Sequence, residues 1–230
     1  MTILEQGLSV CALAHETGVS PFGEQGLELF LEHVRVQAEE VVLVDTSSDG
    51  SVSSEFRSRY ENVNVVRSQH VGKPFDFSRE RNESLEHATH QWLLVLDPDE
   101  RIQNWNAVRN VVAREENIAY LLIGDLVFHP DEYLPKATRK PGESHMLRLF
   151  QNCQGYNFSG NVYEELAGVS KKALATSKLD CEWEHHQTVS QRLEHAERYA
   201  KITGVCNPLP EIMRDLGTAT EQVRKMYCRI

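Results

Sequence analysis

Two aspartates one residue apart, Asp97 and Asp99, follow directly after the apolar run Leu93–Leu96, and Glu100 comes next. Such a run is typical of a buried strand, and ligands of open α/β sheets bind beyond the carboxyl ends of strands. Clustered carboxylates repel one another unless a cation lies between them, and oxygen ligands favour Mg²⁺ or Mn²⁺, which usually arrive with a substrate's phosphates. The alternative is an acidic turn that begins the next helix, and this stretch alone leaves both readings open.

A second acidic segment follows another short apolar run at residues 41–44. It contains Asp45 and Asp49, with hydroxyl residues between them. A carboxylate in this place can accept hydrogen bonds from a nucleobase or a ribose, whereas the simpler alternative is a turn that caps a helix. Because successive parallel strands bring their carboxyl ends together, we expect Asp45 and Asp97 to lie near each other, which favours the cation site.

Three further segments carry polar groups that could take part in chemistry. Arg81 and Asn82 fall in the first turns of a predicted helix, where the helix dipole and a guanidinium can meet a phosphate, but composition alone favours the alternative, a solvated helix face. Glu164 belongs to a pair of glutamates and could act as a general base if it is partly desolvated. His185 and His186 are adjacent, so an extended strand would point them in opposite directions and offer one of them to a metal.

The elements that must position these residues alternate along the chain. Buried strands are predicted at residues 8–14, 41–44, 63–66, 92–96 and 119–128, and helices at 24–36, 78–88 and 105–113. This alternation predicts an α/β fold with a mostly parallel sheet covered on both faces. Residues 129–142, with three prolines, are predicted to form a loop over the sheet edge, and strands return at 146–150 and 179–183. We expect one α/β domain over residues 1–188 and a helical extension over 189–230.

Composition bounds the function classes. The chain has 230 residues and a formal net charge of −10, which argues against a general nucleic-acid surface. Its five cysteines are scattered without a CxxC pair, so neither a disulfide framework nor a zinc knuckle is predicted. The start of the chain lacks the pattern of a signal peptide, and no run approaches membrane-spanning length. We therefore expect a cytoplasmic protein.

The order of the segments resembles the family 2 glycosyltransferases, in particular a small bacterial group of lipopolysaccharide-core and cell-wall transferases. The likeness covers about residues 8–190 and rests on four motifs in one order. They are VDTSSDGS at 44–51, DFSRERNESLEHATHQWLLVLDPDE at 76–100, RLFQNCQGYNFSGNVYEEL at 148–166, and EHHQT at 184–188. The resemblance implies a GT-A fold, a nucleotide-diphosphate sugar donor, and a divalent cation, Mn²⁺ or Mg²⁺.

The resemblance also implies roles for the residues near the donor. Asp45 matches the position that contacts the nucleobase or ribose, and Asp49 matches the second acidic position of the same loop. Arg81 and Asn82 match a pair near the donor, and Asp97 matches the first aspartate of a DxD motif, nearer the sugar or ribose.

For catalysis, the resemblance implies that Asp99 is a metal ligand, that His185 completes the metal site, and that Glu164 is the base. Glu164 would take a proton from the acceptor hydroxyl, and a single displacement would invert the anomeric centre. The chain departs from the family pattern by a first loop one residue shorter and by Tyr163, which stands where histidine is usual.

Two other functions stay open. A nucleotidyltransferase would need a glycine-rich basic loop after the first strand, and residues 15–19 have one glycine and no Lys or Arg. A catalytically degenerate GT-A domain would bind a nucleotide sugar or a partner without turnover.

The acceptor could be a saccharide, a lipid-linked glycan or a protein. The helical extension could pack on the domain, form a homodimer or contact a membrane surface, and packing is what an apolar helix stripe favours.

Overall fold

The computed structural model describes residues 4–15, 21–73, 75–114, 119–131, 136–152, 155–160, 165–168, 178–192 and 194. Its helices are η1 (Gly23–Gln25), α1 (Gly26–Val34), α2 (Ser51–Phe56), α3 (Phe77–His87) and α4 (Trp105–Val112). Its strands are β1 (Glu5–Ala14), β2 (Glu40–Asp45), β3 (Val63–Arg67), β4 (His90–Val95), β5 (Glu100–Ile102), β6 (Tyr120–Phe128), β7 (Thr138–Gln151), β8 (Asn157–Ser159), β9 (Glu165–Ala167) and β10 (Lys178–Gln187).

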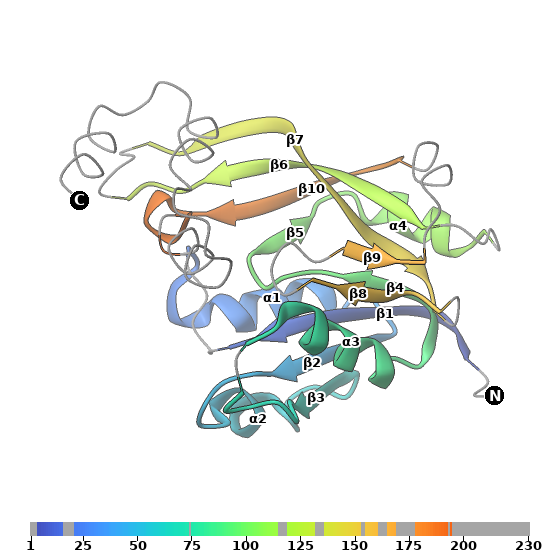
Figure 1. The fold of residues 1–230 in the computed structure, drawn as a ribbon. Helices are drawn as coiled ribbons and strands as arrows, with labels where there is room; N and C mark the ends of the chain where they lie inside the picture. The colour runs from blue at the N-terminus through green and yellow to red at the C-terminus, as the bar shows by residue number, and fades with distance from the viewer. Residues whose placement is uncertain are drawn as a thin grey trace.

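Eight strands form one sheet in the order β3-β2-β1-β4-β7-β6-β10-β5. The neighbours β3, β2, β1 and β4 are parallel, whereas β7 and β5 run antiparallel to the strands beside them. Figure 1 shows the arrowheads of the parallel strands pointing to the left-hand edge of the sheet. The predicted mostly parallel sheet is therefore confirmed, with two antiparallel strands in its second half.

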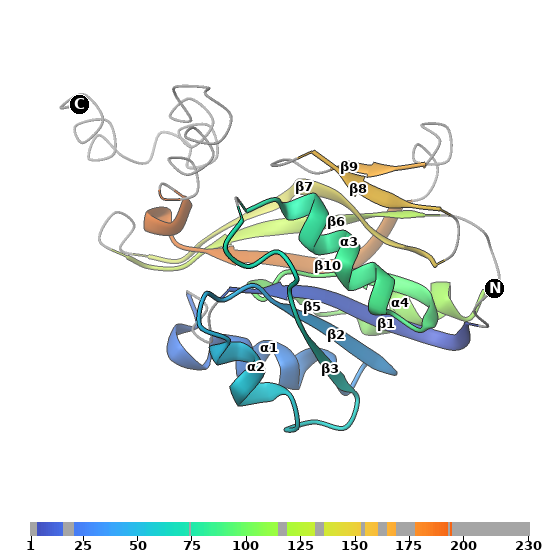
Figure 2. The ribbon, with the colours of Figure 1, turned by 60° about the horizontal axis from the view of Figure 1, so that its bottom comes forward.

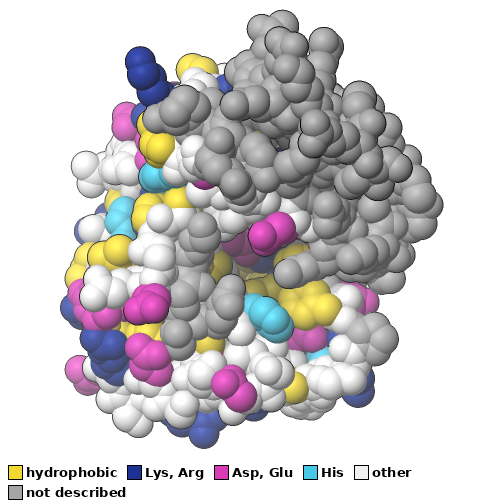
Figure 3. All heavy atoms as spheres, turned by 90° about the vertical axis from the view of Figure 1, so that its left-hand side faces the viewer, with side chains coloured by type: hydrophobic (Ala, Val, Ile, Leu, Met, Phe, Trp, Pro, Cys, Tyr) yellow, Lys and Arg dark blue, Asp and Glu magenta, His cyan; other side chains and the backbone are white. Residues whose placement is uncertain are grey.

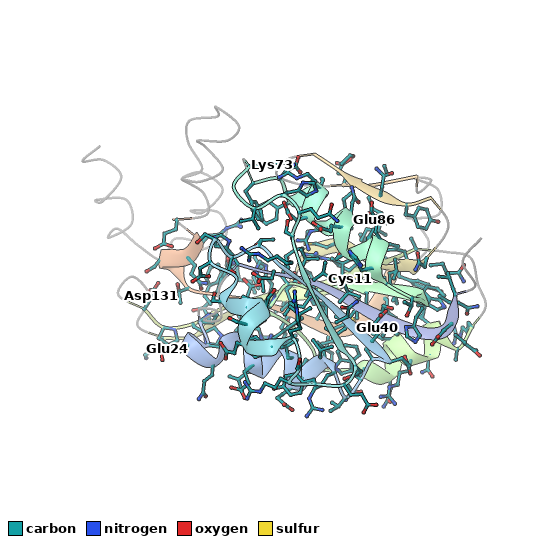
Figure 4. The ribbon with its side chains drawn as sticks, turned by 90° about the horizontal axis from the view of Figure 1, so that it is seen from below. Cys11, Glu24, Glu40, Lys73, Glu86 and Asp131 are labelled. Atoms are coloured by element: carbon teal, nitrogen blue, oxygen red, sulfur yellow. The ribbon has the colours of Figure 1, made fainter. Side chains whose placement is uncertain are left out.

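Helices cover both faces of the sheet, as predicted. Helices α1 and α2 lie on one face, and α3 lies on the other together with the β8–β9 hairpin (Figure 2). Alternation along β4 explains the two layers: Trp92 and Leu94 pack in the core beneath α1 and α4, whereas Leu93 and Val95 pack in the core on the α3 side. Cys11 of β1 points into this second core and lies in the interior of the molecule (Figure 4).

The helix start before α3 follows from its sequence. Asp76 adopts an extended conformation, and its side chain accepts a hydrogen bond from the backbone N–H of Arg79. Asp76 is therefore the N-cap of α3. The cap fixes where the helix begins, and hence which side of it carries Arg81.

The predicted loop over residues 129–142 is wrong in its second part. Strand β7 begins at Thr138, which pairs with Phe128, so residues 138–142 continue a long hairpin with β6. The register shifts between Gly124 and Leu126, and there the Asp125 carboxylate accepts a hydrogen bond from the backbone N–H of Gly142. A bulge of this kind accommodates a proline, which has no backbone N–H to donate to the neighbouring strand. A proline therefore does not exclude a strand here, although the sequence predicted a loop.

The end of the described chain agrees with the predicted change to helix. Strand β10 extends to Gln187, four residues beyond the predicted strand, and residues 189–192 are helical. Most of the predicted extension over 189–230 lies outside the described residues, so the domain boundary stays a prediction. Within the described residues, no helix has the length and apolar character needed to span a membrane.

Candidate functional site at the carboxyl edge of the sheet

The two predicted acidic segments lie at the same edge of the sheet, on either side of β1. Ala14, the last residue of β1, is in register with Asp45 at the end of β2. On the other side, β1 pairs with β4, and the backbone N–H of Leu96 donates to the carbonyl of Cys11, directly before Asp97. Figure 3 looks onto this edge, where acidic and histidine side chains are exposed among hydrophobic ones.

Asp97 is held by two arginines from distant parts of the chain. Arg81 of α3 donates one hydrogen bond to each oxygen of the Asp97 carboxylate, both at 2.9 Å. Arg148 of β7 approaches the same carboxylate at 3.2 Å, and both arginine side chains are only 3% exposed. Burial would raise the pKa of Asp97, but the two guanidinium groups outweigh it and hold that pKa well below its usual range. Asp97 is therefore ionised.

Glu100 closes the turn that contains both aspartates. The backbone N–H of Asp97 donates to Oε2 of Glu100 at 2.8 Å, and the backbone N–H of Glu100 donates to the carbonyl of Asp97 at 2.8 Å. Arg148 donates to Oε1 of Glu100 at 2.9 Å. Glu100 is fully buried; burial and the neighbouring Asp97 charge, opposed by Arg148, raise its pKa to about 7. The conformation of residues 97–100, called the acidic turn below, is thus held by hydrogen bonds within the turn and by the buried Arg148.

Asp99, the second aspartate of the turn, faces His185. Nε2 of His185 lies 3.3 Å from Oδ2 of Asp99, and the backbone N–H of His186 donates to the carbonyl of Asp99 at 2.9 Å. The pairing of β10 with β5, which sets His185 opposite Glu100, brings the histidine to the turn. Burial lowers the pKa of His185, but the Asp99 carboxylate reverses this effect, so the pKa is raised overall.

The two histidines of β10 point in opposite directions, as predicted for an extended strand. His185 stacks beside Trp183 on the side of the acidic turn. His186 instead contacts Glu184 at 3.2 Å and His129 at 2.9 Å. The structure therefore offers His185, and not His186, to the acidic turn.

The Asp99–His185 pair is a partial ligand set for a cation. Among the described residues, no group of three or more His, Cys, Asp or Glu side chains could hold a metal ion. Mg²⁺ in phosphate-binding enzymes is usually held by one or two carboxylates together with substrate phosphates. One carboxylate and one imidazole fit a cation whose remaining ligands come from a diphosphate and water, and they do not fit a closed structural metal site.

Asp45 is used within its own loop. Its carboxylate is fully buried and accepts hydrogen bonds from the backbone N–H groups of Ser47 and Ser53, each at 2.9 Å. Arg67, at the end of β3, lies 2.9 Å from it. Burial would raise the pKa of Asp45, but the hydrogen bonds from Ser47 and Ser53 lower it overall. Asp49 is exposed and accepts from the backbone N–H of Ser51 at 3.0 Å.

These contacts are those of a turn that starts helix α2, the simpler of the two readings of the sequence. The proposed contacts of Asp45 and Asp49 with a nucleotide stay predictions. Beside this loop lies a cavity of about 150 Å³, lined in part by Thr46, Ser48 and Lys73. A cavity of about 280 Å³ lies elsewhere, against the second half of α3 and the end of β7.

Asn82 contacts the main chain of the β8–β9 hairpin. Its side chain donates to the carbonyl of Phe158 at 2.9 Å and accepts from the backbone N–H of Phe158 at 2.7 Å. Ser78, one turn earlier, donates to the carbonyl of Gly160. Glu164, the candidate base, lies outside the described residues, between β8 and β9, so its role stays a prediction.

Arg148 and Arg67 were not among the functional residues predicted from the sequence, and the contact of Glu100 with Arg148 was not foreseen. A signal for Arg148 was available, because a single arginine interrupts the apolar strand residues Leu147–Phe150. A charged side chain in such a strand indicates a buried ion pair, since isolated buried charges are costly. Which carboxylate it meets depends on the order of strands in the sheet, and local sequence patterns do not reveal that order.

Comparisons with known proteins place the chain in a family. The model of glycosyl transferase family 2 matches residues 22–175. A TPR repeat-containing protein of Synechococcus elongatus is 27% identical over 158 residues, which are 66% of this chain and 34% of that protein. The chain therefore spans about a third of the length of this curated relative.

Two solved structures show a weaker likeness. A 4-diphosphocytidyl-2C-methyl-D-erythritol synthase from Anaerococcus prevotii has a TM-score of 0.41 and 15% identity over 63% of this chain and 70% of its own. Residues 1–349 of S. aureus TarS have a TM-score of 0.43 and 14% identity over 82% of this chain and 62% of their own. The family assignment rests on the family model, which matches more than half of the sequence: the chain belongs to glycosyl transferase family 2.

Proposed function

We propose that this chain is an inverting glycosyltransferase that moves a sugar from a nucleotide-diphosphate sugar to an acceptor hydroxyl, with a divalent cation. Family membership supports the reaction class. The observation that carries the proposal is the gathering of the Asp45 loop and the acidic turn at one edge of the sheet, with Asp99 against His185. Ligands of open α/β sheets bind at such an edge.

Asp99 and His185 would hold the cation, and when bound it would neutralise the charge that develops on the leaving nucleoside diphosphate. Glu164 would accept the proton of the acceptor hydroxyl, whose oxygen then attacks the anomeric carbon opposite the leaving group. The new carbon–oxygen bond forms as the bond to the diphosphate breaks, so the anomeric configuration inverts. Asp45, Asp49 and Asp97 are proposed on the nucleotide and sugar side of this reaction.

Arg81 and Asn82 are proposed near the donor because of the family pattern, and their contacts show how this could work. Arg81 keeps Asp97 ionised, and Asn82 fixes the β8–β9 hairpin beside α3. The proposal further includes membership of the lipopolysaccharide-core and cell-wall group, an acceptor that is a saccharide, a lipid-linked glycan or a protein, and a cytoplasmic location.

Calorimetry with a panel of nucleotide sugars, with and without Mn²⁺, tests the donor, and product analysis with saccharide and lipid-linked acceptors tests the transfer. We expect Asp99→Asn to lose cation-dependent donor binding and Glu164→Gln to bind donor normally but form no product. The exposed Glu86→Gln serves as a control that keeps both properties. Binding that depends on the cation but never yields product, with every acceptor, would instead identify a degenerate binding module.

A further inference from the structure

Two buried arginines, Arg81 and Arg148, meet at the acidic turn, and together they are called the arginine clamp below. Arg81 binds both oxygens of Asp97, and Nη2 of Arg148 bridges Oδ2 of Asp97 at 3.2 Å and Oε1 of Glu100 at 2.9 Å. Both side chains are 3% exposed. The two arginines therefore contact the acidic turn from the interior of the protein and not from solvent.

The three carboxylates of the acidic turn differ in their partners. Asp97 and Glu100 are paired with the buried arginines, and a third arginine, Arg101, donates to the carbonyls of Pro98 and Glu100 at 2.8 and 2.7 Å. In the described part of the chain, the ion pair of Asp99 is with His185, and the Arg101 guanidinium acts on Asp99 only through its charge. The charge left for a cation is thus concentrated on Asp99.

We propose that Arg148 is a positioning residue that presents Asp99 to the cation. By joining Asp97 to Glu100 it fixes the conformation of the acidic turn, and with it the place of the Asp99 carboxylate against His185. The loss of an outer partner that orients a metal ligand lowers metal affinity by about 10–100-fold, and Arg148 would act on Asp99 in this way through its contacts with Asp97 and Glu100. This inference rests on the proposed function for its cation, and it gives a role to Arg148, which begins the third family motif but had none in the resemblance.

The test compares Arg148→Met with the wild type and with Arg109→Met, which removes an exposed arginine on α4. Mn²⁺ alone is titrated against each protein below its unfolding temperature and followed by electron paramagnetic resonance. We expect about 10–100-fold weaker Mn²⁺ binding in Arg148→Met, intermediate binding in Arg148→Lys, and wild-type binding in Arg109→Met. A merely structural role for Arg148 would lower the unfolding temperature but leave Mn²⁺ affinity unchanged in the folded protein, and that result overturns the proposal.

A metal-free measurement separates this inference from the proposed function. The ring proton signals of His185 report the position of Asp99 without cation or donor, and we expect them to shift in Arg148→Met but not in Arg109→Met. Unchanged signals overturn the positioning role, whatever the activity. If the wild type neither binds Mn²⁺ nor transfers sugar while these signals do shift, the proposed function fails and the positioning role stands. If Arg148→Met does not fold, the same measurements are made on the double variant Arg148→Met and Glu100→Gln. The second change removes the buried Glu100 charge that the loss of Arg148 would leave without its partner.

Discussion

Gly124 is a position where adding a single methyl group should disturb both the fold and the candidate site. It lies on β6 opposite Trp183 of β10, and the Trp183 side chain is fully buried. A Cβ atom added to Gly124 would overlap Cε3 of Trp183 and lie 2.5 Å from the carbonyl oxygen of Trp183. A change of rotamer can move the ring, but the clash with the carbonyl oxygen can be relieved only by separating the two strands.

The magnitude follows from that geometry. Overpacking a close-packed core costs about 1–3 kcal/mol and sometimes more. Because the strand backbone must move, we expect Gly124→Ala to lie at the upper end, with a loss of about 3 kcal/mol in the free energy of unfolding. For a chain of this size, that corresponds to a fall of roughly 6–12 °C in Tm. Trp183 also stacks beside His185 at 6.4 Å between ring centroids, so the shift should reach the candidate cation site.

Thermal and urea unfolding of Gly124→Ala, Trp183→Phe and the double variant measure this effect. We expect the two changes to be coupled by about 1 kcal/mol or more, because the smaller ring relieves part of the clash. Gly142→Ala in the same hairpin is the control: its Cβ would meet nothing within 4 Å, and its φ of +65° alone costs about 1–2 kcal/mol, with no coupling to Trp183. A Gly124→Ala protein with wild-type stability, or a cycle without coupling, would refute the packing argument.

The burial of two cysteines and the contacts of Asn82 and His185 give three other predictions. Burial raises the pKa of Cys11 and of Cys181 to about 12, so both should stay protonated at pH 8 and escape alkylation in the native protein, as peptide mass spectrometry can check. Asn82→Ala should speed amide hydrogen exchange in β8 while α4 exchanges as before, since it removes both side-chain bonds to that strand. The raised pKa of His185 means that its ion pair stabilises the fold below about pH 6.5 and is lost as pH rises through the higher folded value; an NMR titration showing an unshifted or lowered pKa would contradict this.

The sequence determined the fold class and most of the elements. Apolar runs such as Val41–Val44 and Leu93–Leu96 are continuous because a parallel sheet covered on both faces buries both sides of a strand. The helix predicted over 78–88 is α3, which begins at Phe77 because the Asp76 side chain satisfies a free N–H group of the first helical turn. Both rules depend on residues that are close together in the sequence, so a short segment is enough to predict the element.

Contacts between distant segments could not be predicted in the same way. The strand β5 at residues 100–102 was missed because it is only three residues long and pairs with β10, which comes much later in the chain. The bulge in the β6–β7 hairpin was taken for a loop because prolines have the same local signature in both. Glu164 lies outside the described residues, so its role as the base stays a prediction.

The sequence by itself determined that two acidic segments follow buried strands, and therefore that they share one edge of a parallel sheet. Only the tertiary structure decided how each carboxylate is used: Asp97 is bound by Arg81 and Arg148, and Asp99 is set against His185. The physical reason is that the charge state and orientation of a buried carboxylate depend on its neighbours in space. Those neighbours come from α3, β7 and β10, which only the order of strands in the sheet brings together.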